Sequence, residues 1–64
     1  MRVLLILAAD PDRDVRERLA ANASTPPEVL RLLAADQDDL IRLAVTENPN
    51  TPVDALMRAL GVET

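Results

Sequence analysis

The chain lacks cysteine, histidine, phenylalanine, tyrosine and tryptophan in all of its 64 residues. The absence of cysteine excludes a disulfide and a thiolate metal site, either of which could stabilise so short a chain. Histidine and cysteine also supply many of the general bases, nucleophiles and zinc ligands found in proteins. We therefore expect no catalytic, cofactor-binding or metal-binding residue, and we expect that the protein is not an enzyme.

Lysine is absent as well, so the cations are seven arginines. The chain has eleven acidic residues, and its net charge is −4. A negative charge argues against a phosphate-binding surface, and without aromatic rings there is nothing on which bases could stack. No apolar run approaches the roughly 20 residues of a membrane-spanning helix. The apolar start resembles a short signal peptide, but residues 4–10 recur as residues 30–36, which indicates a structural segment. We expect a cytoplasmic protein with no membrane or small-molecule partner, and nucleic acid is a disfavoured partner.

What the chain does contain is a copy of itself, since residues 7–34 align without a gap with residues 33–60. A repeat at this period is typical of units that expose an apolar face until the next unit covers it. The sequence therefore predicts a single helical-repeat domain over residues 1–64, with a half-unit at 1–9 and repeats at 10–35 and 36–61. The identical positions of chemical interest are Asp10/Asp36, Arg16/Arg42, Asn22/Asn48, Thr25/Thr51 and Pro26/Pro52.

Each repeat carries two helix signals. Asp10-Pro11-Asp12 supplies a cap and a proline for a helix over residues 12–21, whose inward side chains are Val15 and Leu19. Thr25 then predicts an N-cap for a helix over residues 26–35, with Pro26 at its first position. The same signals predict helices over residues 38–47 and 52–60, and the half-unit predicts one over residues 2–9.

Five short helices and no strand predict an all-α fold, a right-handed helical solenoid of about two and a half repeats. The pattern shared by the copies is L-A-x-D-x-D-x-x-(V/I)-R-x-x-(L/V)-x-x-N-x-x-T-P-x-(E/D)-x-L. The residues that carry it are Asp10, Asp12, Val15, Arg16, Asn22, Thr25, Pro26 and Leu30, together with Asp36, Asp38, Ile41, Arg42, Asn48, Thr51, Pro52 and Leu56.

This pattern resembles the leucine-rich repeat variant family of bacterial helical repeats. The resemblance implies that α-helices alternate with 3₁₀ helices in a right-handed superhelix without strands. It also implies a role as an interaction module, which is an analogy at the level of the fold. One type of member carries a cysteine-bound iron–sulfur cluster before the repeats, and that feature does not carry over to a chain without cysteine.

The residues that both copies share have structural interpretations. Arg16 and Arg42 could form an anion-binding ladder, but pairing with the aspartates or turn carbonyls of the same or the adjacent unit is favoured. Asn22 and Asn48 are interpreted as turn residues whose side chains bond to nearby backbone groups. Thr25-Pro26 and Thr51-Pro52 are interpreted as helix starts.

The spacing Asp10-x-Asp12-x-Asp14 is also the opening of a calcium-binding loop. Such a loop needs glycine at its sixth position and glutamate at its twelfth, where this chain has Val15 and Ala21. We therefore expect these aspartates to cap the helix that follows and to favour its positive end.

The exceptions to the repeat are more informative about function. Leu40 and Leu43 replace Asp14 and Glu17, either as a strip that faces a partner or because the second copy is better covered. Val3, Leu4, Leu5 and Ile6 make the first helix apolar almost all round, and such a helix should be buried. A second copy, another protein or a neighbouring repeat could cover it.

The sequence thus favours a non-catalytic module for protein–protein interaction or self-assembly. Its candidate partner-binding residues are Val3, Leu4, Leu5, Ile6, Leu40 and Leu43. The alternative is nucleic-acid or anion binding through the repeat arginines, against which the net charge argues.

Overall fold

The computed structural model describes residues 2–62, and these form five α-helices and no strand. The helices are α1 (Arg2–Ala8), α2 (Arg13–Ala21), α3 (Pro27–Leu33), α4 (Asp39–Glu47) and α5 (Val53–Ala59). Every predicted helix is present, with each end within two residues of its expected position. The expected alternation of α and 3₁₀ helices is wrong for the described residues, because all five helices are α. Bonds of the 3₁₀ type occur at helix ends, as from the Ala35 amide to the Leu32 carbonyl at 3.2 Å.

Aspartates begin the two longest helices, as the sequence predicts. Asp12 is the N-cap of α2 and its Oδ1 accepts the Asp14 amide at 2.9 Å, while Asp38 caps α4 by accepting the Leu40 amide at the same distance. Each carboxylate satisfies one of the amides that a helix start leaves without an intrahelical partner. Pro11 precedes the cap and lies outside the helix.

The predicted capping role of Thr25 and Thr51 is wrong. Pro26 and Pro52 are the N-caps of α3 and α5, and neither helix start has a side-chain cap bond. Because each helix begins one residue later than expected, the threonine lies outside it. The Thr25 hydroxyl instead donates to the Leu19 carbonyl of α2 at 2.6 Å. Thr51 likewise donates to the Val45 carbonyl of α4 at 2.7 Å, so these threonines satisfy the end of the preceding helix.

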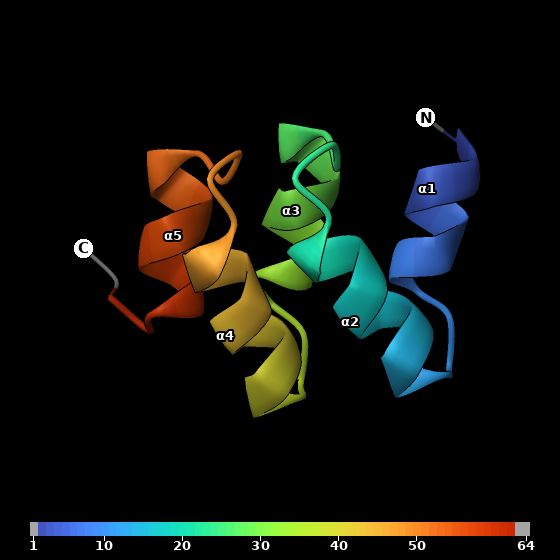
Figure 1. The fold of residues 1–64 in the computed structure, drawn as a ribbon. Helices are drawn as coiled ribbons and strands as arrows, with labels where there is room; N and C mark the ends of the chain where they lie inside the picture. The colour runs from blue at the N-terminus through green and yellow to red at the C-terminus, as the bar shows by residue number, and fades with distance from the viewer. Residues whose placement is uncertain (1, 63–64) are drawn as a thin grey trace.

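The helices lie in two rows, with α1, α3 and α5 in one and α2 and α4 in the other (Figure 1). Helix α3 contacts all four others, whereas α1 contacts only α2 and α3. The molecule measures 31 × 20 × 17 Å along its principal axes. Helices one repeat apart in sequence are therefore neighbours within a row.

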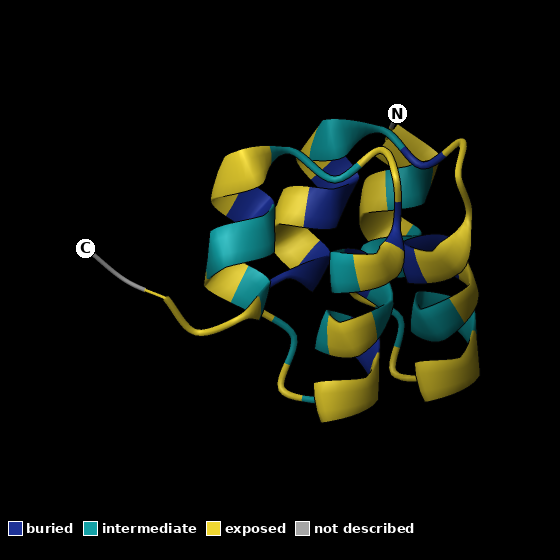
Figure 2. Ribbon diagram, turned by 60° about the vertical axis from the view of Figure 1, so that its left-hand side comes forward, coloured by how far each residue is buried: buried dark blue, intermediate teal, exposed yellow. Residues whose placement is uncertain are grey.

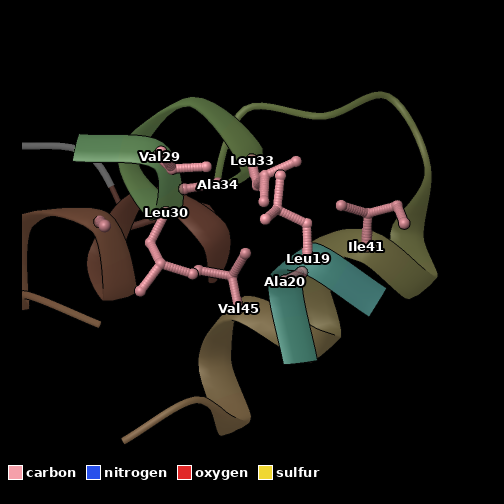
Figure 3. Close-up of a cluster of buried hydrophobic side chains, with 9 residues drawn as sticks. Leu19, Ala20, Val29, Leu30, Leu33, Ala34, Ile41 and Val45 are labelled. Carbon is pink, nitrogen blue, oxygen red and sulfur yellow. The ribbon is translucent and has the colours of Figure 1, made fainter. Parts of the chain in front are cut away.

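The core lies where α3 meets α2 and α4 (Figure 3). Its largest fully buried side chains are Leu30, Leu33 and Val29 of α3 and Ile41 and Val45 of α4. Leu19 and Ala20 of α2 complete the contact with α4. Full burial of such a side chain stabilises the fold by about 1.5–3 kcal/mol, so the α3–α4 unit carries much of the stability.

Candidate functional site

Arg16 links the two repeats. Its Nε donates to Asp36 Oδ2 at 2.8 Å, and its Nη1 donates to the carbonyl of Asp10 at 2.7 Å. The side chains of Arg16 and Asp36 are only 17% and 10% exposed, so water screens the pair weakly. These are the bonds to a neighbouring aspartate and a turn carbonyl that the sequence favours over an anion-binding ladder.

Arg42, the equivalent of Arg16 in the second repeat, forms the bond to the turn carbonyl but not the bond to an aspartate of the next unit. Its Nη1 donates to the carbonyl of Asp36 at 2.5 Å, as Arg16 does to Asp10. The acidic partner differs, because position 62, one repeat after Asp36, holds Val62. Arg42 pairs instead with Asp39, three residues before it on α4, whose side chain is 88% exposed.

Asn22 and Asn48, which occupy the same position in the two repeats, form different hydrogen bonds. Asn22 accepts the Ser24 amide at 2.9 Å, as predicted for a turn residue. Asn48 makes the equivalent bond with Asn50, but its Nδ2 also donates to the carbonyls of Ala20 at 2.7 Å and Asn22 at 2.9 Å. This link between repeats cannot be predicted from the sequence, because both asparagines have a similar local sequence and only the packing of α4 against α2 distinguishes them.

The aspartates before α2 form local bonds. Asp10 Oδ1 accepts the Asp12 amide at 2.8 Å, and Asp12 in turn accepts the Asp14 amide. Among residues 2–62, no group of three or more acidic side chains is placed to hold a metal ion. The bonds to the Asp12 and Asp14 amides confirm the expected role of Asp10 and Asp12 as turn and cap acceptors.

The apolar side chains of α1 divide into an inner and an outer set. Val3, Leu5 and Ile6 are exposed, at 67%, 38% and 64%. Leu4 is half-buried against the core. Val3 and Ile6 are three residues apart on the helix and therefore lie on the same side of it. Exposed positions lie on the ribbon next to the N-terminus (Figure 2).

Val3 is exposed, whereas its equivalents in the other two helices of the same row are buried. The same slot one repeat later is Val29, which is fully buried, and the next is Ala55, which is 1% exposed. The position that is buried in α3 and in α5 is therefore exposed in α1.

Leu40 and Leu43 form a separate apolar surface on α4, at 43% and 52% exposed. No neighbouring helix covers them, so better coverage of the second copy does not explain their identity. Helix α4 makes no contact with α1, and the structure therefore does not bring these leucines together with Val3 and Ile6.

A shallow groove of about 430 Å³ lies between the turn that follows α1 and the turn that follows α3. Its apolar part includes Ala8, Ala35 and Leu32, and its polar part includes Arg16 and Asp36. Because the two charged side chains bond to each other, we assign no ligand to this groove.

No helix within residues 2–62 is long and apolar enough to cross a membrane. Comparison with known proteins leaves the family resemblance a prediction from the sequence. No family model matches this chain, and neither a curated protein nor a solved structure matches it.

Proposed function

We propose that this protein is a non-catalytic interaction module of the helical-repeat type, and that it associates with a second copy through α1. The two rows of helices support a short right-handed solenoid of about two and a half repeats, as do the bonds that join the two repeats, from Arg16 to Asp36 and from Asn48 to the Ala20 carbonyl. In such a fold each unit stabilises its neighbour.

The exposure of Val3 is the main observation that supports this proposal. Its equivalents Val29 and Ala55 are buried, and their helices α3 and α5 each contact the helix one repeat earlier in the same row. The equivalent position of α1 is open and can receive a second copy. Ile6 adds a second large apolar side chain to the outer side of the helix. Two α1 helices related by a two-fold axis would cover each other, which is the commonest arrangement in homo-oligomers.

The expected affinity is modest. The two shorter dimensions of the molecule are 20 and 17 Å, which limits the area that one end can bury. Stable interfaces bury about 800 Å² on each partner, and smaller ones belong to transient complexes. We therefore expect a dimer that dissociates on dilution.

The arrangement of the arginines supports protein binding over nucleic-acid binding. Arg13, Arg16, Arg31 and Arg42 each lie within salt-bridge distance of an aspartate, so four of the seven cations are already neutralised by this chain. No observation on the described residues favours the alternative function.

Size-exclusion chromatography with light scattering, over a range of protein concentrations, tests the proposal. The wild-type mass should rise toward that of a dimer with concentration, and Ile6→Glu should remain monomeric. Leu32→Glu is the matched control, because Leu32 occupies the same slot one repeat later and is 54% exposed in the middle of the chain. A wild-type monomer at high micromolar concentration would refute self-association.

A further inference from the structure

Helices α2 and α4 each turn one side away from the core. In α4, Leu43 lies two residues from both Ile41 and Val45, which are fully buried, so it points to the opposite side of the helix. A stripe of an α-helix that runs through this residue also includes the positions three before it and four after it. In α4 the stripe is Leu40, Leu43 and Glu47, and in α2 the equivalent stripe is Asp14, Glu17 and Ala21. Because α2 packs beside α4 (Figure 1), the two stripes together form a surface that we call the outer face.

The outer face lies along the side of the helical array and not at its end. Repeat units stack on one another along the rows, as α4 packs beside α2 and α3 beside α1. A further unit would cover an end of a row and would leave this side open. Leu40 and Leu43 are 43% and 52% exposed here, although the first repeat has Asp14 and Glu17 in their places. The apolar strip therefore suits a partner that approaches the array from the side.

The outer face is acidic. The ion pairs among residues 2–62 involve none of its carboxylates, which belong to Asp14, Glu17 and Glu47. Glu47 follows Leu43 by one turn of α4, and Glu17 occupies the place of Leu43 on the neighbouring helix. The exposed leucines therefore have a carboxylate beside them on each of the two helices.

The arginines of α2 and α4 do not neutralise these carboxylates. Three of them form the ion pairs with aspartates described above, and these are Arg13, Arg16 and Arg42. Arg18 lies two residues from Arg16, which reaches toward α4, and it therefore points to the other side of α2. A nucleic acid or an anionic lipid surface would be repelled by this face, whereas cationic side chains would be attracted.

We propose, as an extension of the interaction function above to a second surface, that the outer face docks a basic amphipathic helix of another protein. Leu40 and Leu43 contact the apolar stripe of that helix. Glu17 and Glu47 pair with lysine or arginine side chains that flank the stripe. The site is separate from the surface proposed for self-association, because α4 makes no contact with α1.

The probe is a blocked peptide of about 14 residues that has leucines at helical spacing, lysines on both flanks of the leucine stripe and alanine elsewhere. It is titrated at low salt into the isotopically labelled full chain and followed by NMR. We use the Ile6→Glu chain, so that self-association does not contribute. The amide signals of Glu17, Leu40, Leu43 and Glu47 should shift. A peptide with the same leucines and with glutamate in place of each lysine is the charge control, and it should bind about tenfold more weakly.

Substitutions in the chain test the apolar and the charged contacts separately. Leu43→Gln should weaken binding of the lysine peptide about tenfold, because an apolar side chain at the contact is lost. Leu32→Gln is the matched control, since Leu32 is 54% exposed on α3 in the other row, and it should change the affinity less than about twofold. Glu47→Gln should weaken binding several-fold at low salt and have little effect at high salt, where the charges are screened. All three side chains are exposed, so the variants should keep the fold.

Three results would overturn the proposal: absence of shifts at millimolar peptide, equal binding of the lysine and glutamate peptides, or equal effects of Leu43→Gln and Leu32→Gln. Self-association is tested separately, by the mass of the wild-type chain. Binding of the lysine peptide at the outer face by a chain that never dimerises would support this inference and refute self-association. A dimer that ignores the peptide would show the reverse.

Discussion

Arg16 of the first repeat donates its Nε–H to the carboxylate of Asp36 in the second over 2.8 Å, twenty residues away in sequence. Both side chains are mostly buried, and Arg16 bonds at the same time to the carbonyl of Asp10. This pair joins the turn before α2 to the turn before α4. It therefore contributes to the contact between repeats.

Replacement of Arg16 by alanine should lower the free energy of unfolding by about 2 kcal/mol, since charge-assisted bonds to a weakly screened carboxylate are lost. Arg13→Ala removes an ion pair of the same kind with Asp38, but Arg13 is 50% exposed. That control should cost less than about 1 kcal/mol. Urea denaturation of both variants measures the difference, and equal losses would contradict a special role for Arg16.

Asn48→Ala should destabilise the protein by about 2 kcal/mol, because the carbonyl of the buried Ala20 loses this donor and the Asn22 carbonyl keeps only the Thr25 amide. Asn22→Ala is the control, because Asn22 occupies the same position one repeat earlier. Asn22 is exposed, and its side chain accepts only the Ser24 amide of its own turn. We expect a cost below about 1 kcal/mol for that variant. Thermal unfolding of the two proteins should rank them in this order, and the reverse order would show that the link between repeats is unimportant.

The hydroxyl of Thr25 should matter more than its position before α3. Thr25→Val keeps the volume but leaves the Leu19 carbonyl without this donor, which should cost about 1–2 kcal/mol. Thr25→Ser keeps the hydroxyl and should lose less. If the threonine acted by capping α3, amide exchange in the variant would increase at the start of α3; we expect the increase at the end of α2.

The pKa of Asp54 lies below its ordinary value of 3.8, chiefly because Arg31 donates a hydrogen bond to its carboxylate at 2.9 Å. The ionised form is thus favoured in the folded state. The resulting stability is present above pH 3.8 and is lost as the pH falls through the lowered pKa. An NMR titration of Arg31→Gln should show the pKa of Asp54 moving back toward 3.8. Added salt should reduce the shift in the wild type, because the Asp54 side chain is 65% exposed.

Local sequence predicted the helices well. The Asp-x-Asp starts, the proline positions and the spacing of Val15, Leu19, Ile41 and Val45 act within a few residues, so a linear pattern is enough to reveal them. The same local reasoning failed for Thr25 and Thr51, because a threonine beside a proline is an equally good partner for the preceding helix. Because α3 and α5 each begin one residue later than expected, the threonines are not N-caps of these helices and donate instead to the end of the preceding helix.

The candidate surfaces could be predicted only in part. The apolar character of α1 is evident in the sequence, but its division into the half-buried Leu4 and the exposed Val3 and Ile6 depends on which side α3 covers. The separation of Leu40 and Leu43 from α1 likewise follows from the two rows of helices.

By itself, the sequence determined the repeat, the approximate bounds of the five helices and the aspartates that begin two of them, because capping and helical periodicity are short-range effects. Only the tertiary structure decided which copy of each repeated residue forms a link. Arg16 has an aspartate of the next unit and Arg42 does not, while Asn48 has carbonyls of the preceding unit to bond and Asn22 does not. The physical reason is that identical side chains in the two copies have different neighbours in space, and a bond between repeats forms only where the matching partner lies within reach.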